Sequence, residues 1–439
     1  MLKTLVGAFK NKDIRKKILY TLMILVIVRV GSLLPIPGVD TEYFSSLLSG
    51  INTGDLSYLS AFTGGSFERM SLFALSITPY ITSSIIMQFL AIAIPKLEEM
   101  QKEGEDGRKK IAAITRYVTI ALALIESIAM AVGFGRSGLI KGYQGFSTLH
   151  YIVSIIVVVA ALTAGSAMLM WLGERITENG VGNGISIVLL INIISGMPSD
   201  FATLYSTFVA PRTIAKGVLA AAIIIAILVV MVVLVCFLQD GERRIPVQYS
   251  QKVSGRKTFG GQSTNIPLKV NTAGVMPVIF ASSLMQFPVI IAQLFGKSYE
   301  WTRYLSSSYW CRISAPKYSI GLILYIVLLI IFAYFYTSIT FNPIEVADNL
   351  KKAGGVIPGI TPGKSTSDYL NNILNYIVFV GAVGLLIIAL IPIMCTGFFN
   401  ASVSFGGTSV IIIVGVVLET LKQIESQMVN RYYKGFLSE

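Results

Sequence analysis

The sequence predicts an all-α polytopic membrane protein, and both its composition and the placement of its charges support this fold class. The chain has 439 residues, of which 54% are hydrophobic and 13% are charged, and its mean hydropathy is +0.71. Soluble domains carry about 25% charged residues, so this chain has too little charge to cover a water-exposed surface. Because lipid offers no hydrogen bonds to the backbone, the segments that cross it should be helices.

Ten segments can supply these helices, since a crossing needs roughly 20 mainly apolar residues. Eight of them are clear, at residues 18–34, 71–94, 111–134, 151–172, 215–238, 274–294, 320–339 and 373–394. Two are less regular, because 184–197 is followed at once by Pro198 and 409–421 has polar ends. Hydropathy alone allows eight to eleven spans, and we expect ten. The first span is long for a signal peptide and ends without a small-residue cleavage site, so we expect it to be retained.

The basic residues predict the orientation of these spans. With the N-terminus in the cytoplasm, the cytoplasmic segments hold 25 of the 35 lysines and arginines, the opposite side holds nine, and Arg29 lies inside the first span. Cytoplasmic loops normally carry such an excess. The net charge of +12 therefore reports topology first, and an even number of spans returns the C-terminus to the cytoplasm.

The sequence gives little support for catalysis, a metal or a cofactor. His150 is the single histidine, and the three cysteines are far apart. No nucleophile with a base, and no pair of aspartates, occurs within a span. Closely spaced glycines at 180, 182 and 184 lack the preceding strand of a dinucleotide-binding motif. A membrane-embedded enzyme is therefore disfavoured, and we expect neither a cofactor nor a metal site.

Three segments are too distinctive to be plain connectors. Residues 55–70 mix apolar and small residues on the outer side, which fits either an amphipathic surface helix or a re-entrant element. The segments 241–271 and 341–370 are long and rich in proline, glycine and aliphatic residues, and 241–271 carries six basic residues against one acidic residue, Glu242. Their charge alone could serve topology and attraction to anionic lipid. Their length indicates that they also form a docking surface for a partner.

Several long motifs resemble the SecY family, the pore-forming subunits of the bacterial protein-conducting channel. The motifs are FALSITPYITSSIIMQFL at 73–90, the stretch 171–186, ERRIPVQY at 242–249, NIPLKVNTAGVMPVIFASS at 265–283, NPIEVADNLKK at 342–352, FGGTSVIIIV at 405–414 and RYYKGF at 431–436. They occur in order over almost the whole chain.

This resemblance implies a fold and a pore. It implies ten transmembrane helices in two inverted pseudo-symmetric halves, residues 1–210 and 211–439, with a lateral gate between the second and seventh spans. A ring of aliphatic residues should seal the pore, because a hydrophobic constriction excludes water and ions. By the motifs, the ring residues are Ile77, Ile81, Ile185, Leu189, Ile279 and Ile412. The plug, at about 56–70, should include Leu59, Phe62, Gly64, Gly65 and Phe67.

The resemblance also implies the setting and the partners of the chain. The setting is the bacterial plasma membrane, where the channel translocates unfolded secretory polypeptides and releases membrane segments laterally. The implied partners are the small subunits SecE and SecG, the motor ATPase SecA, the ribosome, polypeptides bearing signal sequences, and anionic lipids. Basic residues of the cytoplasmic loops 239–269 and 341–370 should bind the motor and the ribosome. They are Arg243, Arg244, Arg256, Lys257, Lys351, Lys352 and Lys364.

One position departs from the family pattern. In the stretch GITPG the family usually has arginine where this chain has Thr361. Lys364 is near enough to supply charge, but a lysine cannot reproduce the bidentate geometry of arginine.

The main alternative is a secondary transporter of small solutes. Ionisable residues in the spans are sparse, with Arg29, Glu126 and Glu419 the clearest cases. A proton-coupled pump needs a chain of such groups, although a transporter that uses backbone carbonyls does not. The uniformly aliphatic ring favours a passive channel that a partner drives.

Overall fold

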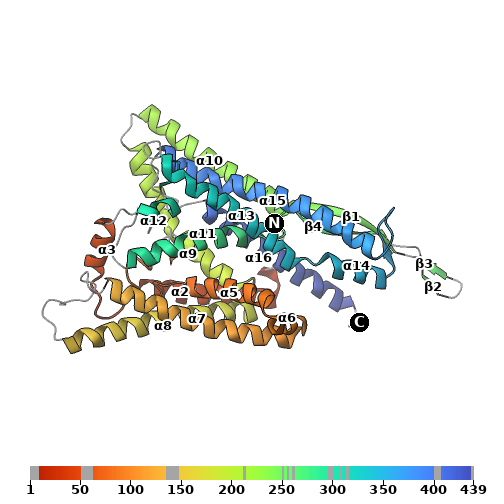
Figure 1. Ribbon diagram of the computed structural model, residues 1–439, viewed down its shortest axis with the longest axis horizontal. Helices are drawn as coiled ribbons and strands as arrows, with labels where there is room; N and C mark the ends of the chain where they lie inside the picture. Colours follow the sequence, from red (N-terminus) through yellow and green to blue (C-terminus); the bar gives the residue numbers. More distant parts are fainter. Residues whose placement is uncertain are drawn as a thin grey trace.

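A computed structural model describes most of the chain and shows a long helical bundle (Figure 1). The described residues are 9–50, 63–134, 148–210, 214–249, 252–254, 257–259, 263–294, 300–306, 309–311, 316–399 and 407–436.

Each of the ten predicted spans coincides with a helix. The helices are α2 (Lys12–Leu33), α5 (Thr78–Ala93), α7 (Glu105–Phe134), α8 (Thr148–Asn179), α9 (Gly184–Leu204), α10 (Ile214–Asp240), α11 (Met276–Leu294), α13 (Ile320–Thr340), α15 (Lys364–Phe399) and α16 (Gly407–Phe436). Shorter helices lie between them: α3 (Thr41–Gly50), α6 (Pro95–Lys102), α12 (Glu300–Leu305) and α14 (Pro343–Lys352).

By length and apolarity alone, six of the described helices can cross a membrane. They are α7, α8, α9 with its π-helical extension Tyr205–Val209, α10, α13 and α15. A seventh results if α5 and α6, which meet at an angle of 106°, count as one bent span. Helix α2 is less uniformly apolar because it carries Arg15, Lys16, Lys17 and Arg29. The chain is thus a mostly helical polytopic membrane protein.

Some helix ends differ from the predicted spans, for local reasons. Helix α5 begins at Thr78 and not at residue 71, because residues 64–77 turn back and forth, with positive φ at Met70 and Ser76. Pro79 lies in the first turn of α5, where a missing N–H costs nothing. Helix α9 continues through Pro198 to Leu204, so it is longer than the apolar run that predicted it.

The fold is not purely α-helical, because the segments 241–271 and 341–370 pair as strands. Strand β1 (Glu242–Tyr249) runs antiparallel to β4 (Ser263–Lys269), with Ile245 opposite Ile266. The short strand β5 (Gly355–Val356) adds to the other edge of β1, giving the order β4-β1-β5. A second hairpin joins β2 (Lys252–Ser254) and β3 (Lys257–Phe259).

This sheet has its own small core at one end of the bundle, with α14 beside it and α3 and α12 at the opposite end (Figure 1). Along β1, Ile245 and Val247 are buried while their neighbours are exposed, as expected for a strand with one covered face. They pack with Leu350 of α14, Ile357 and Leu370 of α15. The two segments predicted as separate loops therefore form one structural unit.

Candidate functional site

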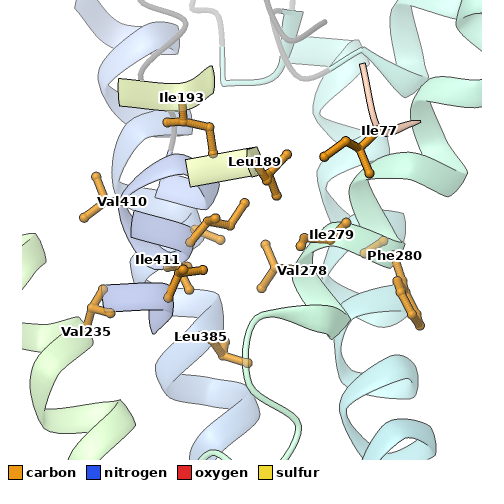
Figure 2. Packing of buried hydrophobic residues seen from close by; sticks show 14 of the residues in the cluster. Ile77, Leu189, Ile193, Val235, Val278, Ile279, Phe280, Leu385, Val410 and Ile411 are labelled. Carbon is orange, nitrogen blue, oxygen red and sulfur yellow. The ribbon is translucent and has the colours of Figure 1, made fainter. Parts of the chain in front are cut away.

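The six residues predicted for the aliphatic ring converge in the largest hydrophobic cluster of the protein. Ile77, Leu189, Ile279 and Ile412 are 1%, 5%, 5% and 1% exposed, and Ile81 and Ile185 pack against them. Figure 2 shows Ile77, Leu189 and Ile279 near one another on three different segments of the chain. Residues from positions 77 to 412, far apart in the sequence, thus share one apolar centre.

Two helices begin beside this centre. Ile77 is the residue that caps the start of α5, and Ile185 is the second residue of α9. The side chain of Asn183 accepts hydrogen bonds from the backbone N–H groups of Ile185 and Ser186, at 3.1 and 3.4 Å. This cap satisfies donors that a helix start leaves free, and it fixes where Ile185 lies.

The start of α9 is also held by close contact with α8. A Cβ atom on Gly184 would lie within van der Waals overlap of the carbonyl oxygen of Gly173, so this approach requires glycine. Conversely, a Cβ atom on Gly173 would meet the Cδ1 atom of Ile185 at 2.7 Å. Gly184, one of the glycines that superficially suggested a nucleotide motif, therefore serves helix packing, as small residues do in membrane helices.

The chemistry of this centre is purely apolar. Branched aliphatic side chains offer water no hydrogen bonds, so a narrow constriction made of them empties of water and blocks ions. Within the described residues, no group of three or more His, Cys, Asp or Glu side chains is arranged to hold a metal ion. The centre can act as a seal.

The turns at 63–77 lie against α9 and connect to it through buried polar groups. Asn192 donates from Nδ2 to Oγ of Ser76 at 3.1 Å. The hydroxyl of Ser195 lies 3.3 Å from the carbonyl oxygen of Gly64 and 2.9 Å from that of Asn192. Gly64 has φ of +62°, and a Cβ atom there would approach the backbone oxygen of Asn192 to 2.6 Å. Only glycine fits this contact.

The predicted plug residues are described in part. Leu59 and Phe62 lie outside the described residues. Gly64, Gly65 and Phe67 belong to consecutive turns, so the end of the predicted plug helix is not helical here. Phe67 is 5% exposed and meets the ring of Phe44 edge-on, with centroids 5.8 Å apart.

Asn192 and Ser195 were not among the predicted site residues. Both lie on an otherwise apolar helix, three residues apart and so on one face. Asn192 is 2% exposed. A lone amide inside an apolar run is the signal that could have identified them, because a polar group in hydrocarbon needs a partner.

Aromatic contacts close the seam between α5 and α13. Phe89 of α5 stacks on Phe335 of α13, with ring centroids 4.6 Å apart and planes at 27°, and it meets Phe332 edge-on at 6.3 Å. Phe280 of α11 also contacts Phe332, at 5.9 Å. Helices far apart in the sequence therefore meet here through their side chains.

The predicted docking cations form separate groups. Arg243 and Arg244 are exposed near the start of β1, where Arg244 pairs with Glu242 at 2.6 Å. Lys351 and Lys352 end α14 beside β5, which pairs with the far end of β1. About five residues of β1, roughly 17 Å of strand, lie between Arg243 and Gln248, the residue that pairs with β5. Lys364 begins α15 and is exposed.

Of the other two predicted cations, Arg256 lies outside the described residues and Lys257 begins β3.

Thr361, the departure from the family pattern, is exposed just before α15. Its hydroxyl donates to Oγ of Ser365 at 2.9 Å, and its carbonyl accepts from the hydroxyl of Thr366 at 2.9 Å. Its side chain therefore helps to order the turn that leads into α15.

Known proteins similar to the chain identify its family. The SecY family model matches residues 71–421. The protein translocase subunit SecY of Streptomyces galbus is 44% identical over 446 residues, covering 100% of both chains. That of Halalkalibacterium halodurans is 42% identical over 445 residues, again covering 100% of both.

Solved structures share the fold at lower identity. A structure of a protein conducting channel aligns with a TM-score of 0.61 and 18% identity, covering 94% of this chain and 93% of the other. Sec61 in the canine ribosome–channel complex aligns with a TM-score of 0.60 and 18% identity over 94% and 93%. The chain belongs to the SecY family, and it is a protein-conducting channel subunit and not an enzyme.

Proposed function

We propose that this chain forms the pore through which unfolded secretory polypeptides cross a bacterial plasma membrane, with the six aliphatic residues as its seal. The observation that carries this proposal is their convergence from α5, α9, α11 and α16 into one buried cluster. Aliphatic side chains have no fixed hydrogen-bond geometry. The ring can therefore deform around any passing side chain and close again behind it.

The turns at 63–77 belong to a plug that covers this ring in the closed channel. The buried contacts from Asn192 to Ser76 and from Ser195 to Gly64 support this assignment, because they can be broken and remade without unfolding α9. A related solved structure is described as one in which the plug domain stabilises the closed state and maintains a membrane seal.

In this proposal all ten helices that coincide with predicted spans cross the membrane. They form two inverted halves, residues 1–210 and 211–439, with both termini in the cytoplasm. Opening between α5 and α11, together with α13 that packs against α11, would release membrane segments into lipid. The side-chain contacts of Phe89 with Phe332 and Phe335 of α13 support a seam of this kind, because packed rings separate at less cost than paired backbones.

The energy for transport comes from partners, which in this proposal are the motor ATPase SecA and the ribosome. Sec61 relatives occur in complexes with ribosomes, and the exposed cations at both ends of β1 suit acidic protein or RNA phosphate. The proposed small subunits are SecE and SecG. The cargo is polypeptides that bear signal sequences, and anionic lipids contact the basic loops.

Crosslinking tests the path directly. A photoreactive residue placed at Ile81 or Ile279 should form adducts with a secretory precursor stalled in transit. The control is the same residue at Ile323 of α13, which is 62% exposed on the bundle surface. Adducts only at position 323 would contradict the proposed path.

Ion leakage tests the seal. Ile279→Ser together with Ile412→Ser should raise the ion conductance of reconstituted vesicles, because hydroxyl groups stabilise water in the constriction. Ile323→Ser, with the same chemical change outside the ring, should leave conductance unchanged. Equal conductance in both variants would show that the seal lies elsewhere.

A secondary transporter of small solutes is the second candidate. A transporter would carry a solute across the membrane even when a stalled polypeptide blocks the ring. It would also require polar groups at mid-membrane. The uniformly aliphatic cluster favours the channel.

A further inference from the structure

The segment between α11 and α13 has an unusual charge for its position. Residues 295–319 contain four basic residues and one acidic residue, Glu300. Helix α12, within this segment, lies at the end of the bundle opposite the strands (Figure 1). In the proposed topology this is the outer side, where lysine and arginine are normally depleted. The local excess of cations therefore has no topological role.

Two of these cations lie against neighbouring tyrosine rings. Nζ of Lys317, in the 3-10 turn Pro316–Ser319, lies 4.9 Å from the ring centroid of Tyr318, and the guanidinium of Arg303 of α12 lies 5.8 Å from that of Tyr309. The cations are exposed, whereas Tyr318 is 5% exposed. Among the described residues, neither cation forms an ion pair with a carboxylate, and Glu300 acts on both only at longer range.

The phenol is a poor match for two positive charges. The pKa of Tyr318 is lowered from its usual value, because Arg303 and also Lys317 favour the negative charge of the phenolate. The surroundings thus favour a negative charge at this point while supplying only a neutral hydroxyl. A group with one negative charge beside Arg303 and Lys317 would partly neutralise their positive charge.

Aromatic residues surround these cations. The ring of Tyr318 lies edge-on to Tyr304 and Tyr309, with centroids 5.0 and 5.9 Å away. Trp310 is buried and donates from Nε1 to the carbonyl oxygen of Tyr304 at 2.8 Å, while Trp301 is exposed. Tryptophan and tyrosine concentrate at the level of lipid headgroups. The cations therefore lie at the depth where lipid phosphates occur.

We propose that Arg303, Lys317 and Tyr318 form a binding site for a phosphate monoanion, and that its source is the phosphodiester of an anionic lipid in the outer leaflet. Arginine presents paired donors to two phosphate oxygens, and lysine adds a point charge. The hydroxyl of Tyr318 can donate to a third oxygen. Assignment to the outer leaflet rests on the proposed topology, whereas the binding site itself does not.

Lipid retention tests this site independently of transport. The full chain, purified with the subunits that accompany it, is washed in detergent containing either phosphatidylglycerol or phosphatidylcholine, and the bound lipid is measured by mass spectrometry. Wild type should retain phosphatidylglycerol in preference. Arg303→Gln with Lys317→Gln should weaken this retention roughly thirtyfold, as expected for two interfacial cations.

Two further variants separate the site from general effects. Arg69→Gln with Lys216→Gln removes the same charge from exposed positions outside the site and should retain lipid like wild type. Tyr318→Phe keeps both cations and the ring packing, and it should retain at least half of the lipid. The proposed site is wrong if wild type and the Arg303–Lys317 variant retain the same amount of phosphatidylglycerol. It is also wrong if the control variant loses as much of this lipid as the Arg303–Lys317 variant.

Inorganic phosphate distinguishes the two sources of the anion. At matched concentration it should displace little phosphatidylglycerol, because the lipid tails add apolar contact. The lipid assignment is wrong if two results occur together. Inorganic phosphate would raise the unfolding temperature of wild type but not of the Arg303–Lys317 variant, and both proteins would retain the same amount of phosphatidylglycerol.

Discussion

Asn192 of α9 donates a hydrogen bond from Nδ2 to Oγ of Ser76, at 3.1 Å, and both residues are almost completely buried. Ser76 itself has φ of +52°, so this turn adopts a backbone conformation that serine rarely takes. The contact joins the segment that precedes α5 to a helix more than a hundred residues later. We expect it to hold the plug in the closed channel.

Asn192→Leu should loosen this contact and increase ion leakage. Leucine has nearly the same size but leaves the Ser76 hydroxyl without its donor, at a cost of about 1–3 kcal/mol to the closed state. Conductance of reconstituted vesicles measures the effect. Ser199→Ala is the control, because Ser199 is exposed on the same helix and bonds only within its own turn. Leakage equal in the two variants would argue against a latch at Asn192.

Gly64→Ala should displace the plug segment, whereas Gly65→Ala should not. Both glycines have positive φ, at +62° and +79°, so each alanine costs about 1–2 kcal/mol of backbone strain. Only Gly64 faces a neighbour, since a Cβ atom would meet Asn192 and Ser195 at 2.6 Å, while Gly65 has open space. Gly64→Ala should therefore make the segment more sensitive to proteolysis and raise ion conductance relative to Gly65→Ala. If the two variants behave alike, the contact of Gly64 with α9 is not needed.

Phe89→Ala should make the seam between α5 and α13 easier to open. Losing the aromatic contacts to Phe335 and Phe332 removes about 0.5–1.5 kcal/mol, equivalent to a 2- to 12-fold shift toward the open state. Translocation of a precursor with a weakened signal sequence should improve accordingly. Phe237→Ala, on the exposed surface of α10, is the control. A loss of transport in Phe89→Ala would contradict a gating role.

Thr361→Arg should strengthen coupling to the motor ATPase, measured as its stimulated ATP hydrolysis. The position is exposed, so arginine fits without repacking and adds a bidentate contact for acidic groups. Thr361→Val removes the hydrogen bond to Ser365 without adding charge and should not increase stimulation. If both substitutions behave alike, the turn geometry matters more than the charge.

The membrane fold follows from local sequence properties. Each predicted span, from 18–34 to 409–421, coincides with a helix because a run of apolar residues must form its own hydrogen bonds in lipid. The ends were less predictable. The turns at 64–77 and the continuation of α9 past Pro198 depend on contacts with other helices, which hydropathy does not contain.

Some functional residues could be predicted from the sequence and others could not. The ring residues came from the resemblance of motifs, since Ile279 and Ile323 look alike along their spans yet are 5% and 62% exposed. Asn192 was missed because its partner, Ser76, is distant in sequence.

By itself, the sequence determined that the chain is an integral membrane protein, where its helices lie and which loops are basic, because composition and hydropathy act over neighbouring residues. Only the tertiary structure decided the pairing of β1 with β5, the meeting of four helices at the aliphatic cluster, and the contact of Asn192 with Ser76. These depend on which surfaces pack together, and packing is a property of residues far apart in the chain.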